Sequence, residues 1–384
     1  MQHVVVFGSG AVGLSYGLQL LETELRIASS FLNLSFIARR DCELIRNHGV
    51  RLVHDDDKEV LTFTADNFTN KVFGHSSDVL ICKGKADWLI VCSKTTSLDS
   101  IRDEILALAH SNTKILLIMN GLGMEDAVAQ YFPHSNIYGA VAYIGANRGP
   151  NPPLDSGPLQ VEIFKLLNLE IGHYLDDQTL LQESVELWKG TRIAPKVLHV
   201  TNLLRARWCK LCWNLTFSGI AVAMGGLTTD VIIEDEGLTK LADDIITESI
   251  HVANADIHSR YMLLQRQENE VEEPTPLFPS LKEDRFSADV LIDLEVHRQR
   301  LWLAARTVGK YKASTVLDLI EGKELEMHYM YSEVLRRARL ASVSRPSISF
   351  AKLEAVLIMV EAMGRISSKK KVLGLDTHPT LFTP

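Results

Sequence analysis

The sequence predicts an α/β protein in two parts, a sheet-based N-terminal domain and an all-helical C-terminal domain. In residues 1–195, short apolar runs alternate with helical patterns, as βαβ units of a parallel sheet require. In residues 196–384, nearly every segment carries apolar residues at three- and four-residue spacing, which is typical of amphipathic helices. A chain of 384 residues is long enough for about two domains, each with its own core.

The N-terminal domain is expected to begin with a buried strand at 3–7, which ends in glycine and leads into a helix at 13–25. Four further strands are expected, at 33–38, 60–65, 88–93 and 114–119. The segment 60–65 alternates as an edge strand does, and a helix is expected at 98–110. Two alternating segments, 159–164 and 169–172, predict antiparallel strands that complete the domain.

The C-terminal domain is predicted to hold five helices, over 198–225, 238–265, 287–309, 314–341 and 349–366. Residues 265–285 are acidic and contain three prolines, so we expect a flexible insertion there. The three lysines at 369–371 are expected to be a solvated tail.

Composition argues against several classes of protein. The net charge of −8 disfavours nucleic-acid binding, which usually shows a basic stripe. The longest apolar stretch, 211–233, contains Asn214 and Asp230, so no membrane span is expected. Five scattered cysteines suit a reducing compartment, and we expect a cytoplasmic protein. Cys209 and Cys212 are spaced as C-x-x-C, but no second pair follows, so no metal site is expected.

A glycine motif, Gly8-Ser9-Gly10-Ala11-Val12-Gly13, follows the first predicted strand and opens the first predicted helix. In that context it indicates a dinucleotide site in a Rossmann-type domain. The glycines allow a tight turn and a close approach of the pyrophosphate, and the helix N-terminus supplies N–H donors.

The end of the second predicted strand distinguishes NADP from NAD. Arg39 and Arg40 stand there, and arginine accommodates a 2′-phosphate, so NADP is favoured, although Asp41 is an opposing charge. This site lies further from the glycine motif than the usual ~20 residues, so residues 22–32 are expected to extend the helix and its loop.

Polar residues follow two neighbouring strands of the predicted sheet. Lys94 follows 88–93, and Asn120 follows 114–119. Ligands of open α/β sheets bind beyond the carboxyl ends of the strands, so both residues are candidates for the site. A solvated lysine and a simple Asn-Gly turn are the structural alternatives.

The helical domain carries a polar line on an otherwise apolar helix, formed by Lys210, Asn214 and Ser218 at four-residue spacing. An unpaired charge is costly to bury, and apolar surroundings can lower the pKa of a lysine, which suits Lys210 to proton donation. The alternative is a lysine whose ammonium reaches water at the helix edge. Ser314, Asp318 and Glu326 form a second cluster, which by itself also fits an ordinary helix start with a surface acid.

The chain resembles the ketopantoate reductases (2-dehydropantoate 2-reductases) over most of its length. The matching residues are Gly8 to Gly13, 37–39, Lys94, Asn120 to Gly123, Lys210, Leu211, Asn214, Ser314, Asp318 and Glu326. The resemblance implies NADPH-dependent reduction of a 2-keto acid, ketopantoate, to pantoate in pantothenate biosynthesis. It also implies an active site in the cleft between a Rossmann-type domain and a helical domain.

Residue roles carried over by position follow from the same resemblance. Lys210 would donate the proton, with Glu326 as its catalytic partner. The substrate would be bound by Asn214, Ser218, Ser314 and Asn120. The cofactor would be bound by Gly8 to Gly13, Arg39, Lys94, Asn120 and Glu326.

Two departures from the family pattern leave the substrate open. Ser218 stands where the family often has a second asparagine, and His328 where an aspartate commonly follows the glutamate. The alternatives are a reductase of another 2-keto acid or a bulkier carbonyl compound, and a non-catalytic NADP-sensing protein that recruits a partner through 265–285. The expected partner is a small-molecule 2-keto acid, with no nucleic acid and no membrane, and a homodimer is possible.

Overall fold

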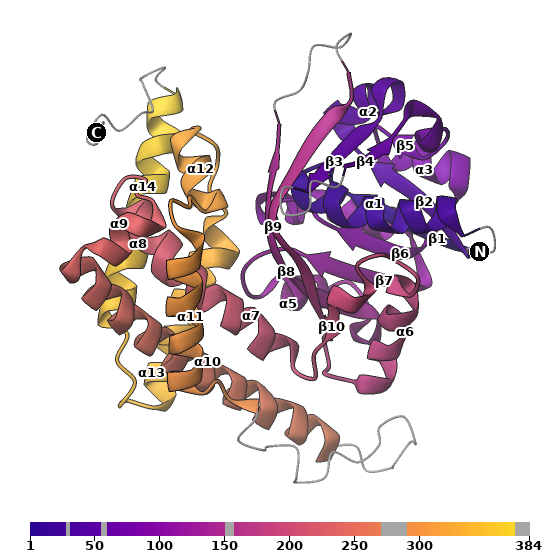
Figure 1. Cartoon of the computed structure of the whole chain (residues 1–384). Coiled ribbons are helices and arrows are strands. Elements are labelled where there is room, and N and C mark those ends of the chain that lie inside the picture. The colour runs from indigo at the N-terminus through magenta and orange to yellow at the C-terminus, as the bar shows by residue number, and fades with distance from the viewer. Residues whose placement is uncertain (28–30, 55–59, 150–156, 270–289, 373–384) are drawn as a thin grey trace. The chain divides into compact units, whose positions relative to one another are not determined.

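The computed structural model describes residues 1–27, 31–54, 60–149, 157–269 and 290–372 (Figure 1). The chain divides into two compact units. Unit 1 comprises Met1–Asn120 and Met124–Leu203, and unit 2 comprises Gly121–Gly123 and Leu204–Pro384. Each unit has a hydrophobic core of its own.

Unit 1 is built on one mixed sheet, ten-stranded within the described residues, in the order β4-β3-β9-β8-β7-β6-β1-β2-β5, with β10 beside β9. The strands are β1 (Gln2–Phe7), β2 (Leu32–Ile37), β3 (Val50–His54), β4 (Val60–Phe63), β5 (Val72–Phe73), β6 (Ala86–Val91), β7 (Ala109–Ile118), β8 (Ile137–Arg148), β9 (Leu159–His173) and β10 (Val197–His199).

The parallel centre of this sheet contains a topological switch point at β1. Val5 of β1 pairs with Ser35 of β2 on one side and with Leu89 of β6 on the other, both in parallel. The chain therefore continues to one side of β1 and later returns to the other. In open α/β sheets, ligands bind beyond the carboxyl ends of the strands at such a point, which here is the glycine motif.

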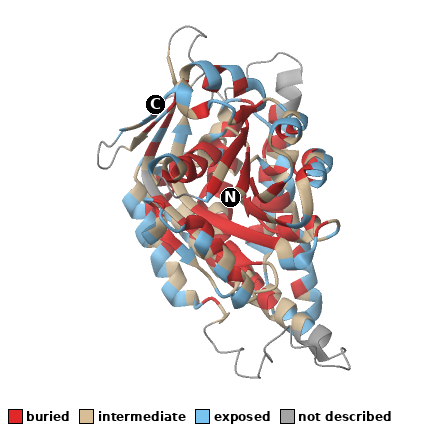
Figure 2. Ribbon diagram, turned by 90° about the vertical axis from the view of Figure 1, so that its right-hand side faces the viewer, coloured by how far each residue is buried: buried red, intermediate tan, exposed pale blue. Residues whose placement is uncertain are grey.

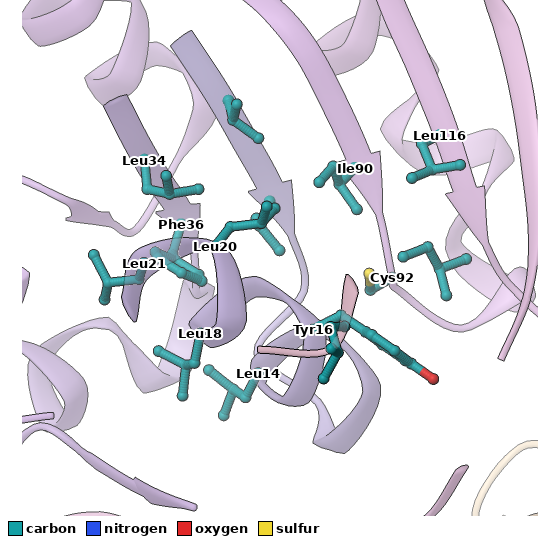
Figure 3. Close-up of a cluster of buried hydrophobic side chains, with 14 of the residues drawn as sticks. Leu14, Tyr16, Leu18, Leu20, Leu21, Leu34, Phe36, Ile90, Cys92 and Leu116 are labelled. Atoms are coloured by element: carbon teal, nitrogen blue, oxygen red, sulfur yellow. The ribbon is translucent and has the colours of Figure 1, made fainter. Parts of the chain in front are cut away.

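Helices cover the sheet because the central strands are apolar on both faces. Those of unit 1 are α1 (Ala11–Arg26), α2 (Cys42–His48), α3 (Ser76–Lys83), α4 (Arg102–Leu108), α5 (Met124–Val128) and α6 (Gln178–Trp188). Figure 3 shows Leu14, Leu18 and Leu21 of α1 in the cluster that also holds Phe36 of β2 and Ile90 of β6. In Figure 2 the central strands are almost wholly buried.

Unit 2 contains helices and their connections, and no strand, within its described residues. Its helices are α7 (Leu203–Trp213), α8 (Gly219–Ala223), α9 (Thr229–Glu234), α10 (Glu236–Asn269), α11 (Leu294–Val308), α12 (Ser314–Ile320), α13 (Glu333–Ser344) and α14 (Ala351–Val372). Two π-helical segments, Asn214–Ser218 and His328–Ser332, stand between α7 and α8 and before α13. Among the described residues, no helix is long and apolar enough to cross a bilayer.

The expected α/β architecture with a helical second part is confirmed, and several element boundaries differ. The helix expected at 98–110 is α4 alone, preceded by short 3-10 turns, because β7 already begins at Ala109. The two strands expected at 159–164 and 169–172 are one strand, β9, antiparallel to β8. The edge strand expected at 60–65 is confirmed as β4. The connection between β1 and β2 was expected to be long, and α1 within it extends to Arg26.

In unit 2, two of the expected continuous helices are interrupted. The helix expected at 198–225 starts only at Leu203, because Val197–His199 joins the sheet as β10, and it changes to π geometry at Asn214. The helix expected at 314–341 breaks after Ile320, where Gly322 has φ +62°. Of the insertion expected at 265–285, residues 265–269 belong to α10 and the rest lies outside the described residues. The lysines at 369–371, expected as a tail, belong to α14.

Candidate active site

The glycine motif folds back on itself at the end of β1. Gly8 has φ +107°, and its N–H donates to the Ile37 carbonyl at 3.2 Å. A Cβ at Gly13 would lie 2.1 Å from the Gly8 carbonyl oxygen, so any larger residue would force the loop open. A Cβ at Gly10 would meet nothing within 4 Å. The space beside Gly10 at the start of α1 is therefore open. The packing of the loop does not itself require a glycine at this position.

The N-terminus of α1 is suited to an anion. Gly10 is the N-cap, no side chain caps the helix, and its first turn contains no acidic residue. The first N–H groups of a helix lack intrahelical partners and carry partial positive charge. With open space beside Gly10, these donors fit the pyrophosphate of a dinucleotide.

The acidic residue after β2 is turned into the protein. Asp41 is 1% exposed, and its carboxylate accepts a hydrogen bond from Ser9 Oγ at 2.5 Å. Its other oxygen lies 2.7 Å from Nη2 of Arg148, at the end of β8. Asp41 thus ties the glycine motif to β8, and this engagement counts against a role as acceptor for ribose hydroxyls.

The two arginines after β2 are exposed. The Arg39 backbone is left-handed, with φ +45°, and its Nη2 lies 2.9 Å from Glu104 Oε1 on α4. The Arg40 side chain is 82% exposed. A guanidinium at this strand end fits a 2′-phosphate.

The carboxyl ends of β6 and β7 carry the other candidates of unit 1. These strands are parallel neighbours, with Val91 opposite Leu117, so Lys94 and Asn120 follow the same edge of the sheet. Lys94 is exposed and Asn120 half-buried.

Sequence reasoning missed Ser93 at this edge. The Ser93 hydroxyl oxygen is buried without a hydrogen-bond partner among the described residues. A Cβ on Gly8 would lie 3.1 Å from the Ser93 backbone nitrogen, so Ser93 borders the glycine motif. A serine at the end of a predicted strand was the only sequence signal.

In unit 2, Lys210 lies half-buried in the last turn of α7, and Asn214 opens the π segment that ends at Ser218. An α-helix turns about 100° per residue, so residues four apart drift by about 40°. The N–H of Gly219 donates to the Asn214 carbonyl five residues earlier, which widens the turn and reduces the drift. The π segment therefore helps to keep Lys210, Asn214 and Ser218 on one face.

The residues between these polar positions are mostly apolar and buried, as expected. Leu211 and Leu215 are fully buried, and burial raises the pKa of the Cys212 thiol well above its ordinary value. Ser218 is 2% exposed, and its hydroxyl has no hydrogen-bond partner among the described residues. A buried hydroxyl of this kind is costly unless a ligand or water completes it.

The residues of the second cluster differ in their exposure to solvent. Ser314 is the first residue of α12 and is exposed, whereas Glu326 is half-buried just before the second π segment. Burial raises the pKa of Tyr331 to about 12; the Thr315 hydroxyl opposes this rise, and the charge of Glu326 adds to it. Glu326 and the neighbour of Ser314 therefore both approach the Tyr331 side chain.

The residues after Asn120 attach to the second π segment, which sequence reasoning also missed. The Leu122 N–H donates to the Tyr329 carbonyl at 2.9 Å, and the Leu122 side chain is fully buried. Gly121 has φ +106°, and a Cβ there would lie 2.5 Å from the Tyr329 carbonyl oxygen. We call Gly121–Gly123 the glycine strap. The two glycines of the strap, Gly121 and Gly123, were the feature of the sequence that could have indicated this close backbone contact.

No group of three or more His, Cys, Asp or Glu side chains in the described ranges is arranged to hold a metal ion. Cys209 and Cys212 are not joined by a disulfide.

Two family models match most of the chain. "Ketopantoate reductase PanE/ApbA" matches residues 4–174, and "Ketopantoate reductase PanE/ApbA C terminal" matches 202–351. A 2-dehydropantoate 2-reductase of Mesorhizobium japonicum is 26% identical over 385 aligned positions, covering 94% of this chain and 97% of that protein.

Solved structures share the fold. The crystal structure of a 2-dehydropantoate 2-reductase from Geobacter metallireducens has a TM-score of 0.72 at 23% identity, covering 94% of this chain and 99% of that one. A D-mandelate dehydrogenase in ternary complex with NADH and anilino(oxo)acetate has a TM-score of 0.69 at 17% identity, covering 96% and 99%.

Proposed function

The chain belongs to the ketopantoate reductase family and is an oxidoreductase of that family, and from this premise we propose that it reduces ketopantoate to pantoate with NADPH. The observation that carries the proposal is the position of Lys210. It lies half-buried at the end of α7, one turn before Asn214, where the helix changes to π geometry. Such π segments are frequent at functional sites.

The proposed chemistry divides between cofactor and protein. When bound, a reduced nicotinamide would be the source of the hydride for the ketone carbon. The Lys210 ammonium gives its proton to the ketone oxygen, which becomes the product hydroxyl, and the resulting amine takes a proton from water. Its positive charge also stabilises the oxygen as negative charge develops on it.

The other candidates bind and orient. Asn214, Ser218 and Ser314 would donate hydrogen bonds to the 2-keto acid, and Glu326 would hold the Lys210 ammonium in position. Lys94 and Asn120 would bind at the nicotinamide end. The unpartnered hydroxyl of Ser218 supports this assignment, because substrate would satisfy it.

NADPH is the proposed cofactor because of the charges after β2. Arg39 and Arg40 are exposed there, while Asp41 is held inward by Ser9 and Arg148. An NAD site would instead offer a carboxylate to the ribose hydroxyls.

The test is Lys210→Ala, assayed by NADPH absorbance with ketopantoate. A positioned general acid typically contributes ~10²–10⁴-fold, so kcat should fall by about that factor while the Kd for NADPH stays within about two-fold. The matched control is Lys323→Ala, which removes an exposed lysine paired with Glu321 in unit 2 and should leave kcat unchanged. A kcat for Lys210→Ala within about three-fold of the parent, far short of that contribution, would contradict the role.

A second candidate substrate is a different 2-keto acid, including a bulkier aromatic one. It is favoured by Ser218, whose side chain is shorter than the asparagine that the family often has at this position, and by the fold shared with D-mandelate dehydrogenase. Comparing kcat/KM for ketopantoate with a panel that includes phenylglyoxylate separates the two. A higher value for phenylglyoxylate would favour the second candidate.

A cytoplasmic location and a homodimer complete the proposal. None of the five cysteines, all of which lie in the described residues, forms a disulfide, which suits a reducing compartment. Leu340 and Val343 of α13 and Ile358 of α14 are exposed apolar side chains that a second copy would cover. Light scattering measures the oligomeric state directly.

A further inference from the structure

The arginine that would bind the 2′-phosphate is already engaged by a carboxylate. Arg39 Nη2 and Glu104 Oε1 lie 2.9 Å apart, with side chains 53% and 30% exposed. Arg39 comes from the turn after β2 and Glu104 from the first turn of α4, so two separate elements bring the pair together. This pairing was not apparent in the sequence, where the residues are 65 positions apart.

We propose that Glu104 is a specificity-determining residue that weakens the preference for NADPH over NADH; this inference rests on the proposed function. A carboxylate and a 2′-phosphate are both anions that accept from guanidinium N–H groups. They compete for the same donors of Arg39 and repel each other. NADH has no 2′-phosphate, so it binds without displacing Glu104.

The pair is exposed, so the competition is moderate. Exposed ion pairs between long side chains contribute little, because water screens the charges and the side chains lose freedom. The 2′-phosphate can therefore displace Glu104. We expect removal of the Glu104 charge to increase affinity for a 2′-phosphorylated ligand about five-fold, equivalent to about 1 kcal/mol. The gain should shrink as salt is raised.

The experiment is calorimetric titration of the full chain with 2′,5′-ADP and with 5′-AMP, which differ only in the 2′-phosphate. Glu104→Gln should bind 2′,5′-ADP about five-fold more tightly than the parent, with 5′-AMP unchanged. The matched control is Glu186→Gln, which removes the same charge from an exposed pair with Lys189 and should change neither affinity. In an Arg39→Ala background, Glu104→Gln should no longer increase 2′,5′-ADP affinity.

The outcomes separate this inference from the proposed function. If Arg39→Ala weakens 2′,5′-ADP binding but Glu104→Gln leaves it unchanged or weaker, the competition is refuted and the NADPH site stands. An equal gain for 5′-AMP also refutes it, because the effect would then not involve the 2′-phosphate. If Arg39→Ala leaves 2′,5′-ADP binding unchanged, both the proposed NADPH site and this inference fail.

Discussion

Replacing Gly121 with alanine tests how firmly the glycine strap is held. Gly121 has φ +106°, which L-residues rarely adopt, and the added Cβ would lie 2.5 Å from the Tyr329 carbonyl oxygen and 2.7 Å from its carbon. Both contacts are to backbone, which cannot rotate away. The backbone strain costs about 1–3 kcal/mol. Overpacking in a well-packed region adds about 1–3 kcal/mol. We therefore expect Gly121→Ala to reduce the free energy of unfolding by about 2–6 kcal/mol.

Urea denaturation followed by circular dichroism measures this loss. The matched control is Gly84→Ala, because Gly84 also has a positive φ, +78°, while its Cβ would meet nothing within 4 Å. It should show only the backbone cost of about 1–3 kcal/mol. If the two variants lose equal stability, the contact with Tyr329 is not the constraint, and the reasoning about the strap is wrong.

Two further predictions concern carboxylates that face arginines. Asp41→Asn should lower the free energy of unfolding by about 3 kcal/mol, because it removes the carboxylate that faces Arg148. It should also weaken NADPH binding, because Asp41 accepts a hydrogen bond from Ser9 of the glycine motif. Urea denaturation measures the first effect and calorimetry the second, and a variant as stable as the parent would contradict the reasoning. Burial by itself would raise the pKa of Glu333, but hydrogen bonds and charge from Arg336 and Arg337 outweigh it and hold the pKa below the ordinary 4.5. A carboxyl with a lowered folded-state pKa stabilises the fold above its unfolded pKa, so this contribution should be lost as pH falls below 4.5. Glu333→Gln should flatten that part of the acid unfolding curve, and an unaltered curve would argue against the assignment.

Features fixed by local residues could be predicted. The glycine motif was recognisable because its glycines stand between an apolar strand and a helix. The sheet centre was recognisable because strands such as β6 are apolar on both faces. Lys210 and Asn214 stood out because polar residues are rare on an apolar helix.

Features that depend on distant partners could not be predicted. The inward turn of Asp41 depends on Arg148, 107 residues later, and the position of Leu122 depends on Tyr329. The π segments could not be predicted, because the spacing of their apolar residues is compatible with both α-helical and π-helical geometry. The break after Ile320 was signalled only by Gly322, which helices can also tolerate.

The glycine strap has a consequence for dissecting the chain. Gly121–Gly123 interrupt the sequence of unit 1 but belong to unit 2, and the Leu122 side chain is fully buried. A fragment ending at residue 203 would leave that leucine bare and the segment after Asn120 without its anchor. We therefore expect a fragment that ends at residue 203 to aggregate more readily than a chain that contains both units.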